Sequence, residues 1–194
     1  DVEALNYIMQ TYLLESILRA GGQQVGVIGT VNMRYPGKVY PAPVTTPESL
    51  DLQRILREML DAGVTHVLME VSSHGLDMHR VDGTRFTVGL FTNLSQDHLD
   101  YHGSLDNYFS AKSRLFSQVL GQQKNTPSLA VINVDDAWGQ KLCSTVGGPL
   151  LRYGLTADAE VRAEKIHANS SGITALFYTP EGEVEIRSPL LGRL

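Results

Sequence analysis

Four short apolar runs constrain the fold of this chain more than any other feature of its sequence. They are residues 25–30, 66–71, 88–92 and 129–134. Runs of this length that are rich in Val, Ile, Leu and Phe are typical of buried strands, and segments with helical periodicity separate them. Strands that alternate with helices indicate parallel β-α-β units, in which ligand-binding loops follow the carboxyl ends of the strands.

Apolar residues at helical spacing predict a helix from Thr11 to Gly21. A strongly amphipathic pattern predicts another helix over residues 105–119. Residues 33–44 are rich in Pro, Gly and Tyr and are predicted to form a loop, and residues 1–10 carry no readable motif. The apolar stripe of the first helix consists of Leu14, Ile17 and Leu18.

The pattern changes near Leu150. Residues 161–187 read as several short strands with alternating side chains, and residues 173–179 and 183–187 flank a Pro-Glu-Gly turn as in a hairpin. The sequence therefore predicts an α/β fold, in which a mostly parallel sheet is flanked by helices and carries a small appended antiparallel sheet.

Composition excludes several classes of protein. The chain has 194 residues, 42% of them hydrophobic, which suffices for a core. The net charge of −5 argues against nucleic-acid binding. The single cysteine, Cys143, leaves no disulfide framework, and no run approaches the roughly 20 apolar residues of a membrane span. We expect a protein of the reducing cytosol, without membrane insertion and without a signal peptide.

The first polar cluster is Thr45-Thr46-Pro47-Glu48, before a helix that Gly63 ends. Its most common use would be a helix N-cap at Thr46 with Pro47 at the first helical position. The alternative is an oxyanion site, because a helix N-terminus with two hydroxyl groups can hold negative oxygens.

The second cluster is Glu70-Val71-Ser72-Ser73-His74-Gly75, with Arg80 just beyond it. Glu70 falls near the carboxyl end of an apolar strand, where a carboxylate is costly unless it is paired or binds a cation. The residues predict either a functional site or a strand end that is followed by a capped helix.

The third cluster, residues 93–103, holds two histidines and two aspartates within six positions after a strand, a pattern that favours a metal site. His98 and Asp97 could equally be ordinary helix-start residues.

Lys112 is the clearest anomaly, because it lies on the apolar stripe of the predicted helix over residues 105–119. It is either a lysine whose charged end reaches solvent or one turned toward the site.

Five stretches occur in a fixed order along the chain: TTPES, EVSSHGLDMHRV, FTNLSQDHLDYHG, YFSAK and INVDD. Together they resemble the Mur ligases, and within that family the UDP-N-acetylmuramoyl-tripeptide synthetases. The resemblance covers residues 11–194 and implies the central, ATPase-type domain, with a fold like that of the P-loop NTPases. Residues 1–10 stay unassigned.

The resemblance implies a two-step reaction in bacterial peptidoglycan synthesis. ATP phosphorylates the terminal carboxylate of UDP-MurNAc-L-Ala-D-Glu, and a diamino acid, meso-diaminopimelate or L-lysine, attacks the acyl phosphate. It implies that Glu70 and His98 hold Mg²⁺ and that a carbamylated Lys112 helps to hold it. It also implies a cytoplasmic, monomeric enzyme. The residues implied in contacts with the uridine-linked substrate are Thr45, Thr46, Ser72 and Arg80.

The chain departs from the family at its start. A Gly-Thr-Asn-Gly-Lys-Thr type P-loop would directly precede the helix at Thr11, and Met9-Gln10 stand there instead. We therefore expect a fragment that is inactive alone and lacks the P-loop, the N-terminal uridine-binding domain and the C-terminal domain that selects the amino acid.

Three alternatives compete with the ligase. The first is a degenerate domain that binds a UDP-sugar or a partner without turnover, and the second is a related ligase such as a folylpolyglutamate synthetase. The third is a metal hydrolase built on His98, Asp100 and His102, which explains nothing about Lys112.

Overall fold

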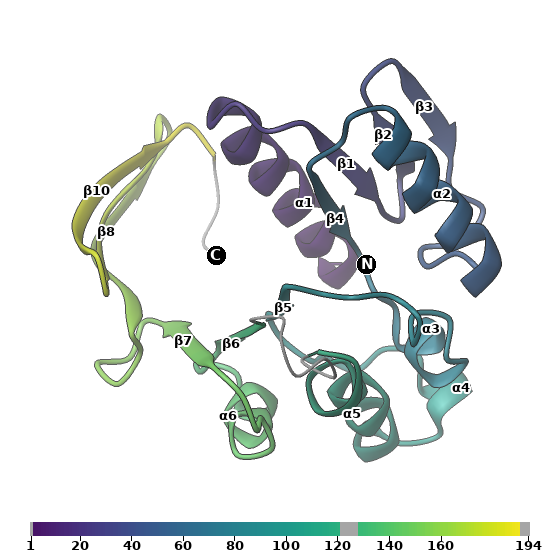
Figure 1. Cartoon of the computed structure of the whole chain (residues 1–194). Coiled ribbons are helices and arrows are strands. Elements are labelled where there is room, and N and C mark those ends of the chain that lie inside the picture. Colours follow the sequence, from purple (N-terminus) through teal and green to yellow (C-terminus); the bar gives the residue numbers. More distant parts are fainter. Residues whose placement is uncertain (1, 121–127, 191–194) are drawn as a thin grey trace. The chain divides into compact units, whose positions relative to one another are not determined.

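The computed structural model describes residues 2–120 and 128–190, with side chains from residue 8 onward. The chain divides into two compact units, and each has a sheet of its own (Figure 1). The first unit comprises Asp1–Thr84 and Asp97–Arg114, and the second comprises Arg85–Gln96 and Leu115–Leu194. All the site residues predicted from the sequence belong to the first unit.

The first unit contains a four-stranded sheet in the order β3-β2-β1-β4. β1 and β4 are parallel, whereas β2 pairs antiparallel with both β1 and β3. The helices are α1 (Val2–Ala20), α2 (Ser49–Asp61), α3 (Ser73–Asp77), α4 (Leu99–His102) and α5 (Leu105–Arg114). The strands are β1 (Val25–Ile28), β2 (Asn32–Tyr35), β3 (Lys38–Pro41) and β4 (His66–Met69).

The core of this unit forms around β1, all four residues of which are buried. Leu52 and Met59 of α2 are fully buried as well. A Cβ atom at Gly26 would lie 2.7 Å from the Met59 sulfur, so glycine in β1 allows the methionine to approach the strand. Close packing of this kind fixes β1 in place, and with it the loop that follows.

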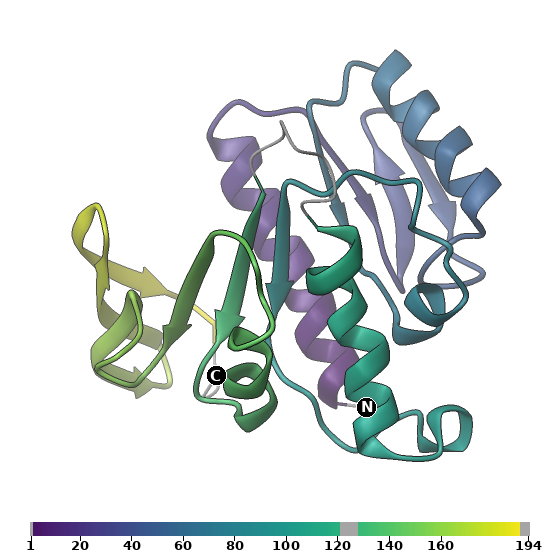
Figure 2. The same cartoon turned by 60° about the horizontal axis from the view of Figure 1, so that its bottom comes forward.

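The second unit contains a six-stranded sheet in the order β10-β9-β8-β7-β6-β5 (Figures 1 and 2). The pairs from β5 to β8 are parallel, and β8, β9 and β10 are antiparallel. Its strands are β5 (Val88–Phe91), β6 (Leu129–Asn133), β7 (Leu150–Gly154), β8 (Val161–Asn169), β9 (Gly172–Thr179) and β10 (Gly182–Ser188). Its helices are the π-helix η1 (Leu115–Val119), which follows α5 directly, and α6 (Ala137–Cys143).

The predicted α/β class is confirmed, with strands at all four apolar runs, parallel pairs β1–β4 and β5–β6, and antiparallel strands appended after β7. Apolar runs identify strands but not their partners, and the structure distributes the four strands over two sheets rather than the single sheet we expected. The helix predicted over residues 105–119 is also confirmed, with a π-helical last turn.

Two expectations about the first 44 residues are wrong. Residues 33–44 contain most of a β-hairpin rather than a loop, because Pro36 and Gly37 form a tight turn in which Gly37 has φ 79°. Residues 2–10 belong to α1, which begins at Val2 instead of Thr11. Asp1 lies outside the described residues, as do residues 191–194 of the segment that resembles the Mur ligases.

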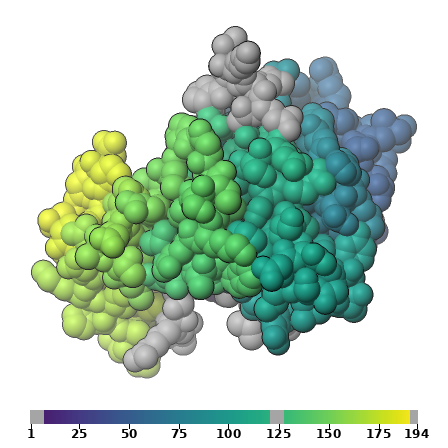
Figure 3. Space-filling model, turned by 90° about the horizontal axis from the view of Figure 1, so that it is seen from below, coloured from purple at the N-terminus to yellow at the C-terminus, as the bar shows by residue number. Residues whose placement is uncertain are grey.

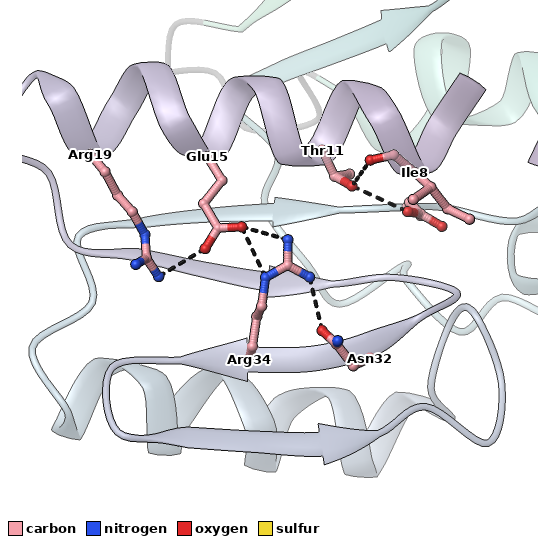
Figure 4. A network of polar contacts seen from close by, with 7 residues as sticks. Ile8, Thr11, Glu15, Arg19, Asn32 and Arg34 are labelled. Atoms are coloured by element: carbon pink, nitrogen blue, oxygen red, sulfur yellow. Dashed lines mark hydrogen bonds and ion pairs between the residues drawn. The ribbon is translucent and has the colours of Figure 1, made fainter. Parts of the chain in front are cut away.

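α1 docks onto the sheet through charges rather than through its apolar stripe (Figure 4). Glu15 is only 7% exposed, whereas Ile17 of the predicted stripe is 66% exposed. The Glu15 carboxylate accepts from Arg34 Nε of β2 at 2.9 Å and forms an ion pair with Arg19 at 2.8 Å. Arg34 also donates to Asn32 at 2.8 Å. A buried carboxylate is tolerated here because two guanidinium groups compensate it.

Glu160 gives the second unit a pH-dependent ion pair. Arg152 Nε donates to Glu160 Oε1 at 3.0 Å, and the arginine holds the pKa of Glu160 at about 2. A carboxyl group whose pKa is lower in the folded than in the unfolded state stabilises the fold at pH values above its unfolded-state pKa. This stability is lost as the pH falls through the folded-state pKa.

We expect Glu160→Gln to lower the free energy of unfolding at pH 7 by less than about 1 kcal/mol, because the pair is partly exposed. The difference from the wild type should shrink from pH 4.5 toward pH 2, as urea unfolding at several pH values would measure. Glu185→Gln, which removes an ion pair on the exposed β10, is the matched control. A pH-independent difference for Glu160→Gln would contradict the assignment.

Candidate active site

Glu70 directly follows β4, at the carboxyl end of the parallel pair β1–β4. Its backbone N–H donates to the Ile28 carbonyl at 2.9 Å, so the parallel register extends one residue past the strand. The carboxylate lies against Gly29, where an added Cβ would be 2.6 Å from Glu70 Oε1. A glycine at position 29 is therefore what leaves room for the Glu70 side chain.

Thr30 donates two hydrogen bonds to the Glu70 carboxylate. Its backbone N–H and hydroxyl reach Oε2 at 2.9 and 2.6 Å, while the Thr11 hydroxyl, which donates to the Ile8 carbonyl at 2.8 Å, lies 3.4 Å from Oε1. Sequence reasoning missed both threonines. The signal for Thr30 was available, because it follows β1 at the same sheet edge where Glu70 follows β4. Thr11 could not be found in this way, since it lies in the middle of a helix.

Thr46 does not cap α2, so the N-cap prediction is wrong. The helix begins at Ser49, and its N-cap residue, Glu48, makes no side-chain capping bond. Thr46 is fully buried, and its hydroxyl donates to the Glu70 carbonyl at 3.1 Å and accepts from the Ser72 N–H at 2.9 Å. The hydroxyl thus ties the segment before α2 to the loop after β4, and the predicted contact of Thr46 with a substrate stays a prediction.

The other predicted substrate residues lie around the same two segments. Ser72 caps α3 by accepting from the Gly75 N–H at 3.1 Å. Arg80 donates to the Thr46 carbonyl at 3.0 Å and pairs with Glu48 at 2.6 Å, while its buried Nε has no hydrogen-bond partner among the described residues. Thr45 and Thr30 are joined through their hydroxyl oxygens at 3.1 Å. The structure therefore brings Glu70 and all four predicted substrate residues into one hydrogen-bonded neighbourhood.

His98 precedes α4 in a left-handed backbone conformation, with φ 54°. Its backbone N–H donates to Asp97 Oδ1 at 2.8 Å. The imidazole packs edge-on against His74, with ring centroids 5.0 Å apart, and against Tyr108, at 5.9 Å. The segment around α4 lies at the molecular surface, where it is drawn in teal (Figure 3), and the His98 side chain is 43% exposed. One side of the ring is therefore packed while the ring remains accessible.

Two further histidines complete an aromatic cluster of α3, α4 and α5. His102 stacks on Tyr108 and forms a hydrogen bond of 2.9 Å between its Nε2 and the buried Ser73 hydroxyl. Burial lowers the pKa of both His74 and His102, with a smaller contribution from neighbouring imidazoles. Both rings thus favour the neutral form, which suits the close packing of His74 against both His98 and His102.

Lys112 is half-buried on α5, and its ammonium lies 5.0 Å from the centroid of the Tyr108 ring. His98 and Lys112 therefore share a buried aromatic neighbour. In the part of the chain that the structure describes, no three His, Cys, Asp or Glu side chains are grouped as a metal site. The convergence of Glu70 with His98 and Lys112 stays a prediction.

Residues 10–194 match the family model described as the Mur ligase middle domain. The chain belongs to this family. It is 48% identical over 184 residues to the UDP-N-acetylmuramoyl-L-alanyl-D-glutamate–2,6-diaminopimelate ligase of Geobacter metallireducens, a match that covers 94% of this chain and 36% of that protein. The chain thus spans about a third of the length of the curated relatives it matches.

Solved structures give the same picture of the Mur ligase middle domain. A structure of a UDP-N-acetylmuramoyl-L-alanyl-D-glutamate–2,6-diaminopimelate ligase superposes with a TM-score of 0.80 at 31% identity, over 92% of this chain and 36% of that one. The MurF ligase from Thermotoga maritima in complex with ADP has a TM-score of 0.62 at 16% identity, over 87% of this chain and 35% of that one, and supports the fold alone.

The donor chemistry of this Mur ligase domain fits a hard cation. Among the described residues, the Thr11 hydroxyl lies 3.4 Å from Glu70 Oε1 but donates its proton to the Ile8 carbonyl at 2.8 Å, so Oε1 retains lone pairs for an ion. Mg²⁺ in proteins commonly takes one or two carboxylates and completes its shell with water and phosphate oxygens. A single well-held carboxylate is thus sufficient protein chemistry for such a site.

None of the described helices is both long and apolar enough to cross a membrane.

Thr46→Val should lower the free energy of unfolding of the chain by about 1–3 kcal/mol, because it leaves the partly buried Ser72 N–H without an acceptor. Thr46→Ser keeps the hydroxyl and should retain most of the stability, which makes it the matched control. Urea unfolding would measure both variants. Equal stability of Thr46→Val and the wild type would show that the bridge to the loop after β4 contributes nothing.

Proposed function

We propose that the full-length protein carrying this domain is an ATP-dependent ligase that joins 2,6-diaminopimelate to UDP-MurNAc-L-Ala-D-Glu through an acyl phosphate, in peptidoglycan synthesis. The observation that carries the proposal is the Glu70 carboxylate, held at a parallel strand end and joined through Thr30 to Thr45. The names of the relatives favour diaminopimelate over L-lysine. We also propose that the enzyme is a cytoplasmic monomer.

Glu70 and His98 would hold Mg²⁺, together with a carbamate on Lys112. When bound, the ion would neutralise negative charge that develops on phosphate oxygens. The chain's own contribution is orientation: Thr30 holds the Glu70 carboxylate through its N–H and its hydroxyl, and Tyr108 packs against both His98 and Lys112. Side chains fixed in this way need no reorganisation when charge develops.

The uridine-linked substrate would contact Thr45, Thr46, Ser72 and Arg80. Arg80 is suited to an anionic group, because its positively charged guanidinium is fixed in place by Glu48 and the Thr46 carbonyl. Thr46 would act chiefly by holding the Ser72 loop, since its hydroxyl is already engaged on both sides. This arrangement supports recognition of a substrate that carries phosphate and carboxylate groups.

We propose that residues 11–194 form the central domain of the enzyme, between an N-terminal uridine-binding domain and a C-terminal domain. The sequence contains no Gly-Lys-Thr or Gly-Lys-Ser loop, so none of its residues is proposed to cradle the phosphates of ATP. That observation also favours one second candidate, a domain that binds a UDP-sugar without turnover.

The test is ADP release by the full-length protein in the presence of Mg²⁺. We expect release only when ATP, UDP-MurNAc-L-Ala-D-Glu and diaminopimelate are all present, with L-lysine a poor replacement. Glu70→Gln should reduce kcat by about two orders of magnitude or more, because it removes an anionic ligand without changing the shape of the side chain. Tight binding of the UDP-sugar without ADP release would favour the second candidate instead.

Lys112 provides an independent test. Lys112→Ala in the full-length protein should lower kcat by about two orders of magnitude or more, because it removes the group that would carry the carbamate. Lys112→Arg should do no better, since a guanidinium keeps its charge and cannot be carbamylated. Mass measurement before and after removal of CO₂ would follow the modification. Full activity of Lys112→Arg, or of an unmodified preparation, would rule out the carbamate.

A further inference from the structure

We propose that Thr30 is a positioning residue, whose hydroxyl donates its proton to the Glu70 carboxylate and holds it in place. The Thr45 hydroxyl then donates to Thr30, which leaves the Thr45 lone pairs to accept hydrogen bonds from a substrate. The inference rests on the proposed role of Glu70 as a Mg²⁺ ligand. It assigns a role to Thr30, which would not contact the ion, and it states which hydroxyl is the donor in each hydrogen bond around Glu70.

The direction follows from counting protons. A threonine hydroxyl carries one proton, and a carboxylate carries none. The contact of 2.6 Å between Thr30 Oγ1 and Glu70 Oε2 therefore uses the Thr30 proton. The contact of 3.1 Å between the two threonine hydroxyls can then be made only if Thr45 donates to Thr30. The hydroxyl groups thus form an ordered chain in which Thr45 donates to Thr30 and Thr30 donates to Glu70.

Thr30 is well placed to orient the carboxylate. Its backbone N–H and its hydroxyl both reach Oε2, at 2.9 and 2.6 Å, so one residue holds one carboxylate oxygen through two donors. Gly29, directly before it, provides the space that the carboxylate occupies. With Oε2 held in this way, Oε1 is the oxygen left to face an ion, because the Thr11 hydroxyl, 3.4 Å away, donates its one proton to the Ile8 carbonyl at 2.8 Å.

The ordered chain has a consequence for Thr45. Its proton is directed toward Thr30, so its hydroxyl offers lone pairs to any group on its other side. Thr45 is therefore suited to a hydroxyl or amide N–H of a substrate rather than to a phosphate or carboxylate oxygen. Such a preference would help to orient a sugar peptide, while Arg80 remains the group suited to its anionic parts.

The test measures binding of Mn²⁺, in place of Mg²⁺, to the full-length protein with a non-hydrolysable ATP analogue, through the electron paramagnetic resonance signal of free Mn²⁺. Thr30→Val removes the hydroxyl but keeps the backbone donor, and we expect it to weaken binding about 10- to 100-fold. Thr30→Ser restores the hydroxyl and should bind nearly as the wild type does. It also shows whether the loss in Thr30→Val comes from the hydroxyl or from misfolding.

Thr45→Val is the matched control, because it removes the next hydroxyl along the same chain. We expect it to leave Mn²⁺ affinity within about twofold of the wild type and to raise KM for the UDP-sugar. Wild-type Mn²⁺ binding by Thr30→Val, or weak binding by Thr30→Ser, would overturn the positioning role. So would an equal loss in Thr45→Val and Thr30→Val.

Glu70→Gln separates the inference from the proposed function on which it rests. Loss of Mn²⁺ binding in Glu70→Gln together with wild-type binding in Thr30→Val would refute the inference and leave Glu70 as a ligand. Wild-type binding in Glu70→Gln would remove the metal role of Glu70, and the inference with it.

Discussion

The parallel pairing of β1 with β4 is the interaction on which the candidate site depends. It continues for one residue beyond the strands, through the bond from the Glu70 N–H to the Ile28 carbonyl, and so sets Glu70 beside Gly29 and Thr30. The two segments are 40 residues apart in sequence, and only the sheet brings them together. A slip of this register would remove the carboxylate from its donors, since side chains alternate along a strand.

Sequence reasoning succeeded where one residue type in one local setting carries the information. Apolar runs identified β1, β4, β5 and β6, and a carboxylate at the end of an apolar strand drew attention to Glu70, whose role as a metal ligand stays a prediction. Thr46 shows where such reasoning fails. Its position before a proline satisfies the local rule for an N-cap, but partners 24 and 26 residues away take its hydroxyl instead. Tertiary partners of this kind leave no trace in a local pattern.

The predictions for the buried face of α1 and for the segment that forms the hairpin β2–β3 were wrong for related reasons. Apolar spacing placed Ile17 inward, whereas Glu15 lies inward because Arg34 of β2 is there to meet it. A pattern within one helix cannot reveal a counter-charge on another element. Similarly, Pro36 and Gly37 were taken as marks of a loop, although the same two residues also make the tight turn that a hairpin requires.

The charged docking of α1 favours one position of this helix along the sheet. A helix held by an apolar stripe can shift by a turn and find similar contacts, because apolar attraction has no direction. Moving Glu15 by one turn would separate it from the guanidinium of Arg34 and leave only the half-exposed Arg19, on the same helix, to compensate its charge. Thr11, one turn earlier on the same helix, is thereby held within reach of Glu70. The ion pair thus sets the position of the helix along the sheet.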